Sequence, residues 1–101
     1  MVNRLLKIIW DIEARNNFYN AIVYIKEESP QNGEKVKRAI ISKVNELKTN
    51  PEKHPPDKYR ENNKGNFRAF EIYHCRISYY ISKSEIRIVR FRHTSMEPLN
   101  Y

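Results

Sequence analysis

The residues best suited to chemistry in this sequence lie near its C-terminal end, in the segment 85–93, which reads EIRIVRFRH. Side chains alternate along a β-strand, so a strand here would direct Arg90 and Arg92 to one face, with His93 directly after them. Guanidinium groups bind phosphate oxygens, and an imidazole can exchange a proton near neutral pH. The segment therefore predicts a binding site for a polyanion.

Further cations lie in the segments that precede this one. Arg68 and Arg76 fall on two strand-like segments, and cations of the loop before them could reach the same sheet face. Such cations, with a group that carries a proton, are the minimum for metal-free RNA cleavage, in which a ribose 2′-hydroxyl attacks the adjacent phosphate. We therefore take Arg68, Arg92 and His93 as candidate catalytic residues. The candidate RNA-binding residues are Lys58, Arg60, Lys64, Arg76, Arg90 and Tyr101.

Two alternatives remain for these residues. An arginine on a strand is commonly a solvated surface residue, and a tyrosine such as Tyr101 can pack at a chain end as well as stack on a base. Metal chemistry is not indicated, because His54, His74 and His93 lack the spacing of metal ligands. The single cysteine, Cys75, would face the apolar side of its strand as a core residue. The sequence thus predicts no metal site and no cofactor.

Charge and length define the class of protein. A chain of 101 residues suits a single domain, residues 1–101, and its net charge is +7. Residues 53–92 contain ten Lys or Arg and four Asp or Glu, a net charge of +6, so the excess is local. A local basic region indicates a nucleic acid or an acidic protein as partner, although it can also be a solubilising surface. No run of apolar residues is long enough for a membrane span and no signal-peptide cleavage site is present, so we expect a cytoplasmic protein without a membrane partner.

The elements that would position these residues follow from hydrophobic periodicity and turn signals. A short apolar segment at 4–9 predicts a first strand, and Trp10 is expected to pack beside it. Apolar spacings of three and four predict two helices, from Ile12 to Glu28 and from Pro30 to about Asn50, capped by Asp11 and Ser29. Residues 51–65 are a predicted loop. Strands are predicted at 67–73, 75–82 and 86–92. The predicted order is β-α-α-β-β-β, an α+β fold in which a helical hairpin packs on a small, mainly antiparallel sheet.

This pattern resembles the RelE/ParE toxin superfamily over nearly the whole chain. The resemblance rests on the first strand, the helix ending Tyr24-Ile25, Ser29-Pro30, the segment 47–51, Arg68, and the last strand with its terminal His93. It implies the toxin of a type II toxin–antitoxin pair, often called a plasmid stabilisation protein. It also implies a cognate antitoxin, which we expect to be acidic.

The superfamily divides by mechanism. RelE-like members cleave messenger RNA on the ribosome, and the resemblance aligns Arg68 with their sheet arginine, His93 with a terminal catalytic histidine and Tyr101 with a C-terminal tyrosine. ParE-like members inhibit DNA gyrase without catalysis. Our primary prediction is a metal-free, ribosome-dependent mRNA endoribonuclease, because the cations concentrate near the predicted site. The alternative is a gyrase inhibitor, favoured by the helical hairpin and by the lack of an acidic general base beyond Glu46 and Glu61. A third hypothesis is a basic domain that only binds nucleic acid.

Overall fold

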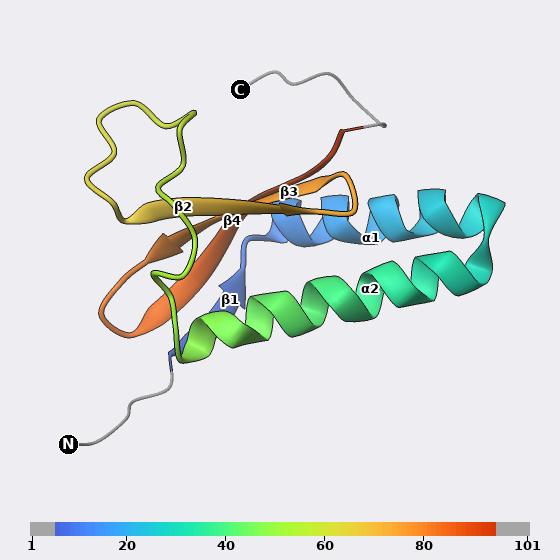
Figure 1. Ribbon diagram of the computed structural model, residues 1–101, viewed down its shortest axis with the longest axis horizontal. Coiled ribbons are helices and arrows are strands. Elements are labelled where there is room, and N and C mark those ends of the chain that lie inside the picture. The colour runs from blue at the N-terminus through green and yellow to red at the C-terminus, as the bar shows by residue number, and fades with distance from the viewer. Residues whose placement is uncertain (1–5, 95–101) are drawn as a thin grey trace.

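The computed structural model describes residues 6–94 of the chain, which form two helices packed on a four-stranded sheet (Figure 1). The predicted order of elements and the α+β class are confirmed. The second helix ends earlier than predicted, and a short 3-10 helix continues it. The elements are β1 (Lys7–Trp10), α1 (Ile12–Glu28), α2 (Pro30–Asn45), η1 (Glu46–Lys48), β2 (Phe67–Ile72), β3 (Cys75–Ile81) and β4 (Glu85–His93).

The strands are arranged in the order β1-β4-β3-β2. β2, β3 and β4 form an antiparallel meander, as predicted, while β1 pairs with β4 in parallel. The helical hairpin returns the chain to the start of β1, where the Leu6 N–H donates to the Lys48 carbonyl at 3.2 Å, and the loop that follows carries the chain to the opposite edge of the sheet, where β2 begins (Figure 1). β2 is consequently an edge strand, and one of its sides has no neighbouring named strand within residues 6–94.

The two helices form an antiparallel hairpin because Ser29 both ends α1 and begins α2. Its backbone N–H donates to the carbonyl of Ile25 at 3.1 Å, and its Oγ accepts a hydrogen bond from the Asn32 N–H, also at 3.1 Å. Pro30 then occupies the first helical position, as predicted. Gly33 lies where α2 approaches α1 so closely that a Cβ atom would collide with the side chain of Lys26. By helix propensity alone, a glycine here slightly destabilises the helix. The close packing of the two helices nevertheless requires it.

A hydrophobic core fills the space between the helices and the sheet. Phe18 of α1 lies at its centre, with its ring edge-to-face against Phe91 of β4 at 5.3 Å and stacked on Trp10 at 5.2 Å. Trp10 is partly buried against this cluster, which confirms its predicted place near the strand–helix junction. Neither long helix in the described part of the chain is apolar enough to cross a membrane. The buried core side chains are Ala14, Phe18, Ala21, Ile22, Val36, Ile40, Val44, Leu47, Phe70, Cys75, Ile77, Tyr79, Ile86, Ile88 and Phe91.

A β-bulge in β4 changes which side chains share a face. Ser78 pairs with Arg90 but the next residue, Tyr79, pairs with Ile88, so Val89 is an extra residue in the ladder. Ile88 consequently joins Phe91 in the core, which strict alternation would forbid. The bulge lies before Arg90, so Arg90 and Arg92 still share one face, as predicted.

Candidate functional site

Three arginines gather on the sheet face that the helices do not cover. Arg76 is the cross-strand partner of Arg92, and Ser78 is the partner of Arg90, so these four residues form one patch, which we call the arginine face. Their neighbours in sequence, such as Ile77 and Phe91, point into the core on the other side. Although the arginine face is polar, Arg76 and Arg92 are only 7% and 3% exposed. Burial of this kind requires partners for the charges.

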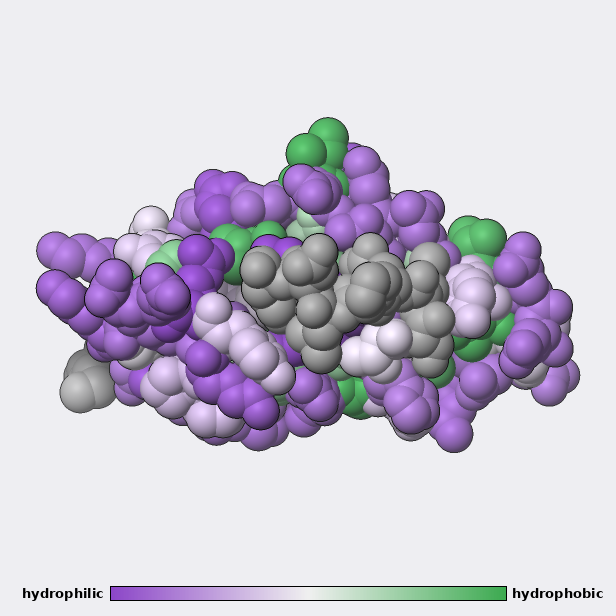
Figure 2. Space-filling model, turned by 90° about the horizontal axis from the view of Figure 1, so that it is seen from above, coloured by the Kyte–Doolittle hydropathy of each residue, from purple (hydrophilic) through white to green (hydrophobic). Residues whose placement is uncertain are grey.

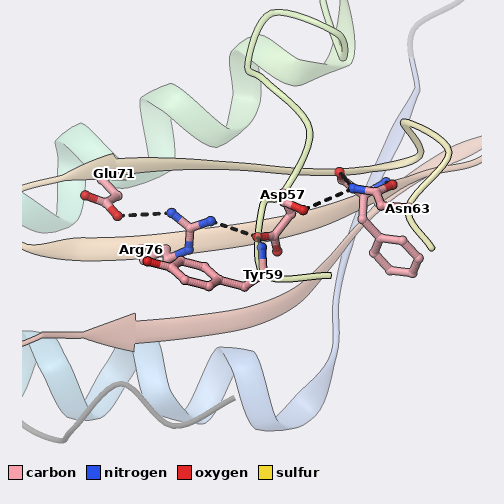
Figure 3. Close-up of polar contacts among 6 residues, drawn as sticks. Asp57, Tyr59, Asn63, Glu71 and Arg76 are labelled. Carbon is pink, nitrogen blue, oxygen red and sulfur yellow. Dashed lines mark hydrogen bonds and ion pairs between the residues drawn. The ribbon is translucent and has the colours of Figure 1, made fainter. Parts of the chain in front are cut away.

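Arg76 has such partners in two carboxylates (Figure 3). One of its terminal nitrogens lies 2.8 Å from Asp57 Oδ1, and the other lies 3.0 Å from Glu71 Oε2. The ring of Tyr59 lies against the guanidinium, 4.7 Å from its centre. Burial opposes ionisation of Asp57, but the Tyr59 N–H and the Arg76 guanidinium outweigh it and hold the pKa of Asp57 below its ordinary value. The sequence predicted Arg76 as an RNA-binding residue or a solvated one, whereas the structure places it in a buried ion pair.

The ion pair fastens the long loop 49–66 to the sheet, and Asn63 completes the attachment (Figure 3). The Asn63 side-chain amide donates to the carbonyls of Asp57 and Phe67, at 3.3 and 2.7 Å, and its oxygen accepts from the N–H of Gly65 at 2.9 Å. Asp57 N–H in turn donates to the Phe67 carbonyl at 2.8 Å. Sequence reasoning missed Asp57 and Asn63. The available signal was weak, because Asp57 is one of three acidic residues in a basic, proline-rich loop.

Arg68 lies on the opposite sheet face from the arginine face. Its cross-strand partner is Tyr79, a core residue. The Arg68 Nε donates to the Gly65 carbonyl at 3.0 Å and Nη1 donates to the His54 carbonyl at 2.7 Å. Arg68 therefore binds backbone carbonyls of the loop, and these hydrogen bonds attach the loop to β2.

His93 lies on the same sheet face as Arg68 but at the other end. Its cross-strand partner is Cys75, and its ring is edge-to-face with Tyr24 of α1 at 5.5 Å. Burial, together with the nearby His74, lowers the pKa of His93 and so favours its neutral imidazole. His93 also lines a cavity of about 230 Å³ between the helices and the end of β4.

The structure does not bring the three predicted catalytic residues together. The β3 partners of Arg68 and His93 are four residues apart, roughly 13 Å along the strand, and two strand spacings add roughly 10 Å across the sheet. The Cα atoms of Arg68 and His93 are therefore separated by on the order of 16 Å. Arg92 points to the other face altogether. The expected convergence is wrong, and a catalytic role for these residues stays a prediction.

Two of the remaining predicted RNA-binding residues, Lys58 and Arg60, lie beside aromatic side chains near the arginine face. The guanidinium of Arg60 stacks on the ring of Phe67 at 3.9 Å, and the Lys58 ammonium lies 5.2 Å from the ring of Tyr59. Lys64 is exposed on the same loop. Tyr101 lies outside the described residues. The contacts of Lys58 and Arg60 with aromatic rings form an arrangement that also occurs where proteins bind single-stranded nucleic acid.

Metal and thiol chemistry find no support in the described part of the chain. Within residues 6–94, no three His, Cys, Asp or Glu side chains gather as a set of metal ligands. Burial raises the pKa of the Cys75 thiol to about 12, so it remains protonated at neutral pH. Cys75 is fully buried in the core, which confirms its predicted position.

The fold and the sequence place this chain in the RelE/ParE superfamily of toxins, as the resemblance implied. Residues 8–98 match the family described as "ParE toxin of type II toxin-antitoxin system, parDE", so the chain belongs to the ParE toxin family. Membership in this family implies an antitoxin protein as partner. The chain is also similar in fold to a solved structure described as the chromosomal ParDE TA system from P. aeruginosa. The TM-score is 0.69 at 15% identity, and the match covers 88% of this chain and 96% of that chain. No curated protein matches the sequence.

Proposed function

We propose that this toxin acts by binding DNA gyrase, a protein target, and does not cleave messenger RNA. The observation that carries the proposal is the separation of Arg68, Arg92 and His93. Cleavage of one phosphodiester requires a base within hydrogen-bond reach of the 2′-hydroxyl and an acid near the leaving 5′-oxygen. Groups at opposite ends and on opposite faces of the sheet cannot meet this requirement. Membership in the ParE family supports the same conclusion, because ParE-like toxins are the gyrase inhibitors of the superfamily.

The exposed apolar surface of α1 also suits a protein target. Ile12, Tyr19 and Val23 are 70%, 53% and 59% exposed, and their spacing of seven and four residues puts them on one face of the helix. Exposed apolar stripes are typical of protein–protein contacts. Much of the rest of the surface is hydrophilic, as Figure 2 shows for the molecule seen from above. A charged target alone would not require the α1 stripe.

A gyrase assay combined with a messenger RNA assay tests the proposal. Purified toxin should inhibit supercoiling by gyrase and trap gyrase-linked DNA breaks in a dose-dependent manner. Primer extension on messenger RNA from cells expressing the toxin should show no codon-positioned cuts. The near-isosteric variant His93→Gln should arrest growth as strongly as the wild type. Codon-positioned cuts that disappear in His93→Gln would refute the proposal, and harmless expression in several hosts would refute any toxin function.

Messenger RNA cleavage is the second candidate, because one observation favours it. The arginine face combines three guanidinium groups with the aromatic ring of Tyr59, a suitable surface for an RNA backbone and its bases. In that case the variant Arg90→Gln, at a half-buried position near the middle of the patch, should abolish the cuts while His93→Gln retains them. Absence of cuts with the wild-type protein, together with inhibition of supercoiling, would support gyrase inhibition instead.

A further inference from the structure

Two cavities in the described part of the chain differ in the charge of their walls. The larger, which we call the β2-edge cleft, has a volume of about 460 Å³ and is lined by Lys43, His54, Lys58 and Phe70, among others. None of the ion pairs formed within residues 6–94 includes Lys43 or Lys58, so this cleft is cationic. The smaller, which we call the hairpin cavity, has a volume of about 230 Å³ and lies beside the turn between the two helices. Its walls are formed by Tyr24, Ile25, Glu28, Ser29, Asn32 and His93.

The hairpin cavity contains a carboxylate that forms no ion pair within residues 6–94. This carboxylate belongs to Glu28, the last residue of α1. The nearest cation in the sequence, Lys26, is already bound to Glu34 at 3.0 Å. The next cation along the chain, Lys35, lies over the ring of Tyr73 at 5.8 Å. Although the chain as a whole has a net charge of +7, this cavity therefore favours a cationic ligand.

The helix ends at this turn do not reverse that preference. The C-terminal end of α1 favours cations and the N-terminal end of α2 favours anions, so the two helix dipoles oppose each other where they meet. Ser29 also occupies a backbone group of each end, because its N–H donates to the Ile25 carbonyl and its Oγ accepts from the Asn32 N–H, each at 3.1 Å. The charge of Glu28 therefore decides which ligand the cavity attracts.

An aromatic ring and an amide accompany the carboxylate. Tyr24 and Glu28 are four residues apart in α1, so their side chains lie on the same face of the helix. The Tyr24 ring is 42% exposed and packs edge-to-face on His93, whose pKa is lowered by burial so that its neutral form is favoured. No hydrogen bond within the described residues uses the side chains of Tyr24, Glu28 or Asn32. An aromatic face, a carboxylate and an amide oxygen are groups that bind a guanidinium.

We propose that the hairpin cavity binds the guanidinium of an arginine side chain on the protein target of the toxin. The cavity is smaller than the roughly 300–1,000 Å³ of a site for a drug-sized ligand, so it suits a single side chain. A guanidinium pairs with both carboxylate oxygens of Glu28, lies flat on the Tyr24 ring and donates a further N–H to Asn32 Oδ1. His93, which is 7% exposed, forms a wall of the cavity and is assigned no contact with the guanidinium.

The chemistry of the cavity also separates this ligand from its nearest rivals. A lysine ammonium lacks the planar face and the paired donors, so it fits the same groups less well. A phosphate is repelled by the carboxylate of Glu28, so the cavity suits a protein and not a nucleic acid. The identity of the partner as the target rests on the proposed function, whereas the preference for a guanidinium does not.

A pair of small probes tests the chemistry of the cavity by nuclear magnetic resonance with the full-length protein. The probe is N-acetyl-arginine methylamide, and the matched control is N-acetyl-citrulline methylamide, in which a neutral urea of nearly the same size replaces the guanidinium. The arginine probe should shift the resonances of the Ser29 and Asn32 amides and of the Tyr24 ring. The citrulline probe should bind at least tenfold more weakly. Equal binding of the two probes, tighter binding of the lysine analogue, or shifts confined to residues outside the cavity would overturn the proposal.

Variants of two neighbouring glutamates separate the cavity from general electrostatic attraction. Glu28→Gln removes the carboxylate at nearly the same shape and should weaken binding of the arginine probe by roughly fivefold or more. Glu27→Gln is the matched control, because Glu27 also forms no ion pair within residues 6–94 but does not line the cavity. It should change binding by less than about twofold. Tyr24→Leu should weaken binding by roughly threefold, because the aromatic face is lost. Equal losses in the two glutamate variants would show that only net charge matters and would overturn the site.

A supercoiling assay distinguishes failure of the cavity from failure of the proposed function. Half-inhibition of gyrase should require roughly tenfold more Glu28→Gln toxin than wild type, whereas Glu27→Gln should match the wild type. If the wild type does not inhibit gyrase, the proposed function fails while the probe measurements still decide the cavity. If the wild type inhibits gyrase but the arginine probe does not perturb the cavity, the cavity proposal fails and the proposed function stands. Inhibition by Glu28→Gln at wild-type concentrations would overturn the target as the source of the arginine.

Discussion

The arginine face and the β2-edge cleft both contain cationic side chains, but these differ in whether a carboxylate neutralises them. On the arginine face, Arg76 is 7% exposed and lies between the carboxylates of Asp57 and Glu71. In the cleft, Lys43 and Lys58 form no ion pair within the described residues 6–94. A buried cation with a buried partner is fixed by the fold and stabilises it, whereas an unneutralised cation beside an open strand edge remains available to a ligand. Charge in the sequence does not distinguish the two; the position of the acidic residues does.

Breaking the buried ion pair should produce the largest effect. Asp57→Ala removes the buried carboxylate that lies beside the buried charge of Arg76, and should lower the free energy of unfolding by about 3 kcal/mol. Asp57→Asn keeps an acceptor for the Tyr59 N–H and should cost about half as much. The measurement is urea unfolding followed by circular dichroism.

The control for this prediction is Glu71→Gln, which removes the other carboxylate of Arg76. The Glu71 side chain is 62% exposed, so its loss should cost less than about 1 kcal/mol. If Glu71→Gln proves as costly as Asp57→Ala, burial does not decide the strength of these pairs, and the contrast between the two regions loses its basis.

Acid should weaken the ion pair between Asp57 and Arg76. The pKa of Asp57 is below its ordinary value in the folded protein, so its contribution to stability is fully present above the unfolded pKa and is lost as the pH falls through the folded pKa. Unfolding free energies measured from pH 6 down to pH 2 should therefore decrease for the wild type. In Asp57→Asn the decrease should be smaller, and identical slopes for the two proteins would show that Asp57 does not carry this dependence.

The sequence was sufficient for the fold because its signals are local. Ser29-Pro30 marks the turn between the helices, and the alternation in 75–81 marks a strand with a buried face. The positions of the candidate site residues depend instead on contacts between segments that are distant in the sequence. The bulge at Val89 and the pairing of Arg68 with Tyr79 depend on strand register, which fixes the face and the end at which each side chain lies.

The role of Arg76 could not be predicted for a similar reason. Its partner Asp57 is nineteen residues earlier, in a loop that has no periodicity to define its path. The cleft depends on the same loop, because His54 and Lys58 reach the β2 edge only when Asp57 and Asn63 hold the loop in place. Sequence patterns located the basic region correctly, but could not separate its structural cations from those that remain available.

Removing a cation from the cleft should have the smallest effect on stability, which makes the contrast with Arg76 measurable in a single type of experiment. Lys43→Gln deletes a charge that stabilises no ion pair within residues 6–94, and it leaves the Cβ and Cγ atoms of the side chain in place beside Phe70. The free energy of unfolding should change by less than about 0.5 kcal/mol. Relief of repulsion with Lys58, which lines the same cleft, should offset part of any loss, as expected for a site whose charges are arranged for a ligand and not for the fold. A loss comparable to that of Asp57→Ala would show instead that Lys43 is a structural residue, and the two regions would then be alike.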